Sequence, residues 1–88
     1  SWALGAYHAR PMIEPSEIER RILAVLPDAK IHVEDLTGGK DHYQVHVVSA
    51  AFAGLMPLKR HRLVYEPFKD VLGGPLHALT LTTKTPDE

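Results

Sequence analysis

The feature that most constrains this sequence is a pair of alternating apolar and polar runs on either side of a short turn. Alternation with a period of two is typical of half-buried strands, and the two runs cover residues 29–36 and 42–49. Residues 37–41 between them read Thr-Gly-Gly-Lys-Asp, and paired glycines favour a turn. The sequence therefore predicts an antiparallel β-hairpin.

A helix is expected before this hairpin. Ile18, the residues four and eight positions after it, and Val25 at i+7 are apolar, which is the spacing of one helix face. Ser16 followed by Glu19 matches the capping box, in which the serine oxygen accepts a hydrogen bond from an amide of the first turn. These signals predict a helix over residues 16–26, ended by the Pro-Asp step that follows.

A second helix and a last strand are expected after the hairpin. Apolar residues recur at i, i+4, i+7 and i+8 from Val64, behind Pro57, which suits a first helical position. Pro67 falls inside this pattern and should kink or divide the helix. Residues 50–56 leave room for one helical turn, and residues 76–83 alternate again, with threonines that favour a strand.

The predicted order is helix, strand, strand, an optional helical turn, helix, strand. This order favours the α+β class, as a two-layer sandwich with a three-stranded sheet and the helices on one face. Because the third strand arrives after a helical crossover, we expect it to run parallel to one strand of the hairpin, which makes the sheet mixed.

Composition narrows the possible functions of this 88-residue chain. Ten Lys+Arg against eleven Asp+Glu give a net charge of -1, which disfavours a general affinity for nucleic acid or anionic membrane but permits a local basic patch. No cysteine is present, so disulfides, thiolate nucleophiles and cysteine-ligated metals are excluded for this chain alone. No apolar run approaches the ~18 residues of a membrane span. Without a secretory signal, we expect a cytoplasmic protein.

The first residues differ from the rest of the chain. Residues 1–11 show neither a helical nor a strand period, whereas Met12 opens the regular patterning. We interpret residues 1–11 as an expression leader and residues 12–88 as a single domain.

The histidine content is unusually high, with six histidines in 88 residues. It titrates near neutrality and is the commonest neutral metal ligand, so the excess points to a metal. His8 lies in the leader segment and drops out of the functional count. His32 and His46 fall on the polar phase of their strands, where simple exposure to solvent is the leading interpretation.

Several short motifs occur in an order that carries a family resemblance. From about residue 18 to residue 88 the sequence resembles the BolA-like family, through Asp41-His42-Tyr43, Val47-Val48-Ser49, Phe52, Gly54, Arg60-His61-Arg62, Val64-Tyr65, Leu76-His77-Ala78-Leu79 and Thr85-Pro86. Each motif alone is weak, but their shared order and spacing are specific. Residues 12–88 would then form one BolA-like domain.

The resemblance implies a fold like the type II KH domain and a protein that is not an enzyme. It also implies a partnership with a monothiol glutaredoxin, in which the two proteins share a [2Fe-2S] cluster. The glutaredoxin supplies a cysteine and glutathione a thiolate, while the BolA-like chain supplies a histidine and a second ligand from a loop. The isolated chain is then expected to hold no cofactor.

His77 matches the ligand position that the resemblance implies, at the start of the last strand. The second ligand is less defined, because the loop at residues 37–41 contains neither histidine nor cysteine. His42, at the exit of that loop with Asp41 before it, is the nearest candidate. The competing interpretation is that His42 stabilises the hairpin or caps the loop.

An alternative function is DNA binding, because some BolA-like proteins are described as transcriptional regulators. Lys59 and the Arg60-His61-Arg62 motif form the one dense basic patch, and a helix that carries them could contact phosphates. Lys40 in the glycine turn could also approach a phosphate backbone. The competing interpretation is a solvated helix face, on which Arg62 pairs with a glutamate one turn later.

The remaining expectations are negative or open. No nucleophile with a matched base appears, which agrees with a protein that is not an enzyme. No membrane partner is expected, and the chain is expected to be a monomer or a weak homodimer.

Overall fold

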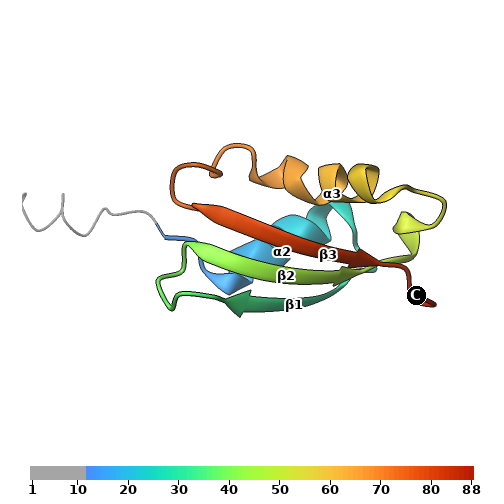
Figure 1. Cartoon of the computed structure of the whole chain (residues 1–88), viewed down its shortest axis with the longest axis horizontal. Helices are drawn as coiled ribbons and strands as arrows, with labels where there is room; N and C mark the ends of the chain where they lie inside the picture. The colour runs from blue at the N-terminus through green and yellow to red at the C-terminus, as the bar shows by residue number, and fades with distance from the viewer. Residues whose placement is uncertain (1–11) are drawn as a thin grey trace, which may run out of the picture.

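The computed structural model describes residues 12–88 (Figure 1). The interpretation of residues 1–11 as a leader falls outside this part of the chain. The elements follow the predicted order and confirm the α+β class. They are α2 (Pro15–Val25), β1 (Lys30–Asp35), β2 (His42–Val48), the 3-10 turn η1 (Ala50–Phe52), α3 (Pro57–Tyr65), the 3-10 turn η2 (Glu66–Phe68) and β3 (Ala78–Lys84).

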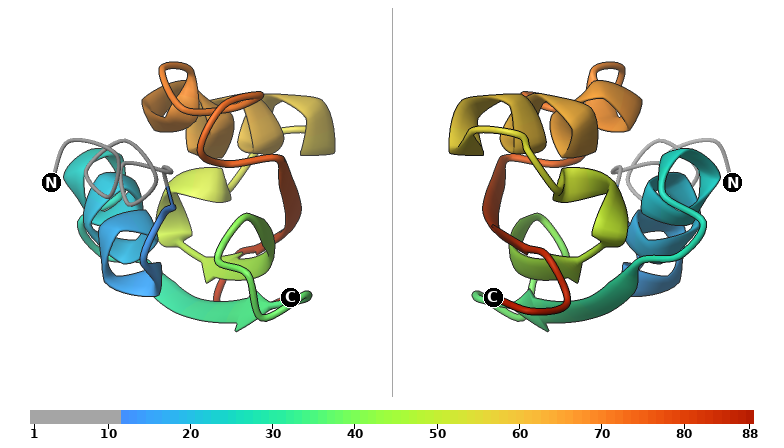
Figure 2. Two further views of the ribbon diagram at one scale, coloured as in Figure 1. Left: turned by 90° about the vertical axis from the view of Figure 1, so that its left-hand side faces the viewer. Right: turned by 90° about the vertical axis from the view of Figure 1, so that its right-hand side faces the viewer.

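The three strands form one mixed sheet in the order β1-β2-β3. β1 and β2 pair antiparallel, as the hairpin pattern predicted, and β3 pairs parallel to β2. Both helices pack on one side of this sheet, and no further layer of described residues covers the other side (Figure 2). The two-layer arrangement is therefore confirmed, with β2 at the centre of the sheet.

The start of α2 differs from the prediction. The helix begins at Pro15, the N-cap residue is Glu14, and no side chain caps the first turn. Because proline has no N–H and its φ suits the first helical position, Pro15 can start the helix without a side-chain cap. Ser16 consequently lies inside the first turn, and the predicted capping box is wrong.

Pro67 divides the second helical region as predicted. α3 ends at Tyr65, and the tighter turn η2 covers Glu66–Phe68. Beyond it, the backbone N–H groups of Gly73 and Leu76 bond Leu76 and Val71 carbonyls, respectively. This compact turn delays the last strand, which begins at Ala78 and not at residue 76.

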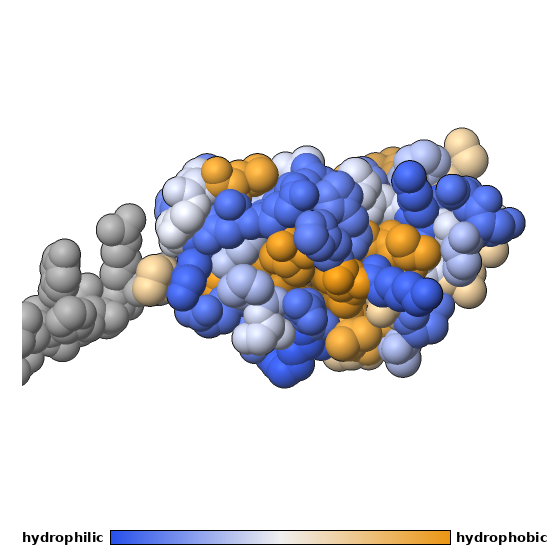
Figure 3. Space-filling model, turned by 90° about the horizontal axis from the view of Figure 1, so that it is seen from below, coloured by the Kyte–Doolittle hydropathy of each residue, from blue (hydrophilic) through white to orange (hydrophobic). Residues whose placement is uncertain are grey.

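The core lies between the helices and the inner face of the sheet. Every second residue of β2 is buried, because the inner face of a strand repeats with a period of two. The fully buried side chains gather in one cluster that includes Ile18, Ile22, Tyr43, Val45, Phe52, Val64, Phe68 and Leu76. Seen from below, the surface of the molecule is mostly hydrophilic with some hydrophobic patches (Figure 3).

Candidate metal centre

Parallel pairing of β2 and β3 brings the two predicted ligands together. His42 opens β2 and lies opposite Ala78, the first residue of β3, so His77 lies directly before that pair. The backbone N–H groups of His77 and Ala78 both donate to the Asp41 carbonyl, at 2.8 and 3.1 Å. These bonds hold the two histidines side by side at one end of the sheet.

The side chains of this cluster converge. The imidazole rings of His42 and His77 are stacked, with centroids 5.6 Å apart and ring planes only 4° from parallel. Asp41 Oδ2 lies 3.5 Å from His77 Nδ1 and 4.0 Å from His42 Nε2. One donor atom from each of these three residues lies within 4.8 Å of the other two. Asp41 therefore joins the site, although sequence reasoning had not assigned it as a ligand.

The loop before β2 holds Asp41 in position. The carboxylate of Asp35 accepts hydrogen bonds from the backbone N–H groups of Thr37, Gly38 and Lys40, at 3.3, 3.0 and 3.1 Å. Thr37 Oγ1 in turn donates to Asp41 Oδ1 at 3.1 Å. One carboxylate oxygen of Asp41 is thus engaged by the loop, and the other faces the histidines.

Tyr43, the residue after His42, anchors the start of β2 in the core. Its side chain is fully buried beneath the start of β2, and its hydroxyl donates to the Ile13 carbonyl. Burial, together with nearby carboxylates, raises the pKa of Tyr43 to about 12. The phenol is therefore a neutral donor at physiological pH, and it fixes the strand that carries His42.

These donor atoms suit a metal ion of intermediate hardness, such as iron or zinc. Neutral imidazole suits iron and zinc, and a carboxylate adds a harder oxygen donor. The side chains of His77 and His42 are 58% and 41% exposed, so both are accessible to a second molecule. Because these 88 residues contain no cysteine, a thiolate ligand has to come from outside them. These residues fit the histidine contribution to an iron–sulfur cluster.

The predicted basic residues do not form one continuous surface. Arg60 forms hydrogen bonds and an ion pair within the fold. Its side chain is only 12% exposed, donates to the Leu55 carbonyl at 2.8 Å and pairs with Glu88 at 2.6 Å. Its guanidinium also lies 5.9 Å from the centre of the Phe52 ring. The bond from Arg60 lowers the pKa of the Glu88 carboxyl to about 2. A guanidinium with these partners is not free to bind phosphate.

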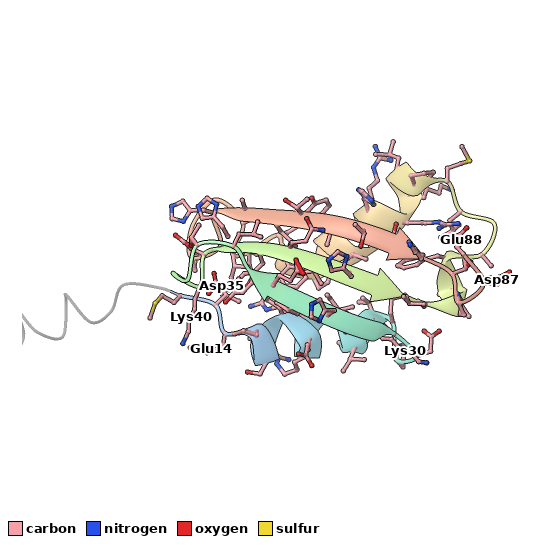
Figure 4. All side chains as sticks on the ribbon, turned by 60° about the horizontal axis from the view of Figure 1, so that its bottom comes forward. Glu14, Lys30, Asp35, Lys40, Asp87 and Glu88 are labelled. Carbon is pink, nitrogen blue, oxygen red and sulfur yellow. The ribbon has the colours of Figure 1, made fainter. Side chains whose placement is uncertain are left out.

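Lys40 lies away from the other basic residues. It pairs with Glu14 at 2.9 Å beside the β1–β2 loop, whereas Glu88, the partner of Arg60, lies at the opposite end of the sheet (Figure 4). Lys59 and Arg62 are exposed on α3. They line a shallow groove of about 400 Å³ together with Leu55, Leu63 and Glu66. The four predicted residues therefore form no single surface.

Comparison with known proteins decides the family. A family model described as BolA-like protein matches residues 16–88. The chain belongs to the BolA-like family. The structure of BolA1 from Arabidopsis thaliana superposes on this BolA-like chain with a TM-score of 0.76, at 34% identity, over 86% of this chain and 98% of that one.

Two proteins of known name are similar to this BolA-like chain in sequence. Mouse BolA-like protein 1 is 51% identical over 49 residues, which are 56% of this chain and 36% of the mouse protein. The DNA-binding transcriptional regulator BolA of Vibrio cholerae is 39% identical over 72 residues, 82% of this chain and 67% of that protein. The chain thus spans about a third of the mouse relative. Neither name describes an enzyme.

The described part of this BolA-like chain, residues 12–88, contains no helix with the length and hydrophobicity that a membrane-spanning segment needs.

Proposed function

We propose that this chain is a non-enzymatic partner of a monothiol glutaredoxin. The two proteins would form a heterocomplex that shares a glutathione-ligated [2Fe-2S] cluster, for iron–sulfur cluster trafficking or for iron and redox regulation. The observation that carries the proposal is the pair of accessible, parallel imidazoles of His42 and His77, with an Asp41 carboxylate oxygen within 4.0 Å of a nitrogen of each ring. A cytoplasmic location and a monomer or weak homodimer stay predictions.

Each residue of the cluster has a separate role in this proposal. His77 is the first ligand, and His42 replaces the ligand that the short loop does not supply. Asp41 positions them, since its carbonyl accepts from the His77 backbone and its carboxylate faces both rings. The cluster supplies electron-transfer chemistry when bound, and histidine in place of cysteine on one iron raises its potential.

Anaerobic reconstitution tests this proposal. The chain is mixed with a monothiol glutaredoxin, glutathione, iron and sulfide, and visible absorption and circular dichroism are recorded against glutaredoxin alone. We expect new bands that His77→Ala abolishes and His42→Ala weakens. His61→Ala is the matched control, because His61 lies on α3 against Tyr65, and it should leave the bands unchanged. A spectrum identical to that of glutaredoxin alone would contradict the shared cluster.

DNA binding is the second candidate, and the name of the Vibrio cholerae relative favours it. The exposed cations Lys59 and Arg62 on α3 support this alternative. It is weakened by the engagement of Arg60 with Glu88 and by the position of Lys40 at the other end of the sheet. A failed reconstitution would give Lys59 and Arg62 priority as the functional surface.

A further inference from the structure

A second pair of histidines lies on the open face of the sheet. His32 of β1 is directly opposite His46 of β2 in the antiparallel register. Tyr43, Val45 and Val47 face the core, so His46 points to the other side of the sheet, away from both helices. The two imidazole rings are stacked with centroids 5.7 Å apart. Neither ring belongs to the His42–His77 cluster.

A carboxylate joins these two rings. Glu34 lies two residues after His32 on the same face of β1. Its Oε1 is 3.5 Å from His32 Nε2, and its Oε2 is 3.7 Å from His46 Nε2. The Nε2 atoms of both histidines therefore approach one carboxylate from two strands.

The third strand orients one of the histidines. Thr82 of β3 lies opposite His46 in the parallel register, and His46 Nδ1 is 2.6 Å from Thr82 Oγ1. When Nδ1 donates this hydrogen bond, Nε2 carries the free lone pair and faces Glu34. A ligand histidine whose second nitrogen is held by a protein oxygen is the usual arrangement at metal sites.

From this arrangement we propose that His32, Glu34 and His46 form a second metal site, which binds one divalent transition-metal ion such as Zn²⁺. Two imidazoles and a carboxylate are a common ligand set for zinc, with a fourth position left to water. Unlike Asp41, His42 and His77, these three residues do not bring one donor atom each within 4.8 Å of the other two, so a shared ion requires a rotation of one side chain. His32 can make it, because its side chain is 70% exposed.

The second site is independent of the candidate iron–sulfur ligands. His42 and His46 are four residues apart on β2, a separation of about 13 Å along an extended strand. One ion cannot bridge that distance with direct ligands. Either cluster can thus be removed by mutation while the other is kept.

Zinc titration of a variant without the first cluster tests the proposal. In the full chain carrying His42→Ala and His77→Ala, isothermal titration calorimetry with Zn²⁺ should show one site, and the NMR ring signals of His32 and His46 should shift. Adding His46→Ala should weaken binding by about tenfold or more, because loss of an outer-shell partner alone costs about 10–100-fold. Equal Zn²⁺ affinity with and without His46 would overturn the site.

Two further variants separate ligation from structure. His32→Ala removes the more exposed ligand and should weaken Zn²⁺ binding while the far-ultraviolet circular dichroism stays unchanged. Thr82→Val should also weaken binding, and Thr82→Ser should restore it, because only the hydroxyl holds His46 Nδ1. If Thr82→Ser binds Zn²⁺ as weakly as Thr82→Val, or if His32→Ala keeps the parent affinity, the proposal is wrong.

Discussion

At the scale of single residues, Gln44 has a buried amide nitrogen without a hydrogen-bond partner among the described residues. It lies in the middle of β2 on the polar face, opposite Glu34 on one side and Thr80 on the other. Within residues 12–88, its Nε2 is the buried side-chain atom that has no hydrogen-bond partner. A covered donor without an acceptor costs about 1–3 kcal/mol.

We therefore expect Gln44→Val to raise the free energy of unfolding by about 1 kcal/mol, because it removes the unpaired donor and introduces a β-branched strand former. Urea denaturation measures the change. Thr80→Val is the matched control, since Thr80 is exposed on the same face and carries no such penalty. A lower stability of Gln44→Val would show that the amide has a partner in solution.

At the scale of elements, contacts of Arg21 connect the turn η2 to α2. Phe68 is fully buried, and the guanidinium of Arg21 lies 5.8 Å from the centre of its ring. Arg21 also donates to the Pro67 carbonyl at 2.7 Å and pairs with Asp70 at 2.6 Å. One arginine of α2 thus covers the ring that η2 places in the core.

Phe68→Ala should lower the free energy of unfolding by about 3–5 kcal/mol, because it leaves a large cavity in the core. A small domain has little stability to spare, so the variant should melt far below the parent or not fold. Thermal melting followed by circular dichroism measures this. Leu63→Ala, at a position that is 38% exposed on α3, should change the melting temperature much less. Equal effects of the two substitutions would contradict the assigned core.

Elements were predictable where a buried face repeats along the chain, and less so at their ends. The alternation in β2 and the stripe from Ile18 each follow one local period. The alternation is confirmed, and so is the burial of Ile18, Ile22 and Leu26. Val25, at the last residue of α2, is 44% exposed, so its place on the stripe was wrong. The start of α2 depends on the choice between Ser16 and Pro15 as the initiating residue, which periodicity does not determine. The delayed start of β3 depends on backbone bonds within residues 71–76.

The candidate site shows the same limit over longer distances. His77 and His42 were both proposed from sequence, but their stacking depends on which hairpin strand pairs with β3. The sequence left that choice open. Likewise, no local spacing signals that Arg60 pairs with Glu88, so a residue of the basic motif was interpreted as a phosphate contact.

At the scale of the whole molecule, ion pairs connect segments that are far apart in sequence. Arg60 of α3 holds Glu88 near the end of β3, and Arg21 joins α2 to the turn after η2. The bonds from Arg20 and Arg21 lower the pKa of Glu17 from 4.5 to about 2, and Arg60 does the same for Glu88. Both carboxylates are charged in the fold at a pH where an unfolded chain is already protonated.

These lowered pKa values set the direction of the acid response. The unfolded chain binds more protons between the two pKa values, so the contribution of each pair is present above about pH 4.5 and is lost as the pH falls to about 2. Urea midpoints recorded across this window should fall steadily for the parent. Glu88→Gln should show a shallower fall, because one titrating pair is absent. An identical slope would mean that the Arg60–Glu88 pair does not persist in solution.

The parallel pairing of β2 and β3 also determines when His42 and His77 come together during folding. A crossover that contains η1, α3 and η2 separates the two strands, and closing so long a connection is slower than forming a hairpin. A nascent or half-folded chain consequently offers His42 and His77 one at a time, as isolated imidazoles. Under the proposed function, binding through both histidines therefore requires the complete sheet, so folding has to precede capture of the cluster.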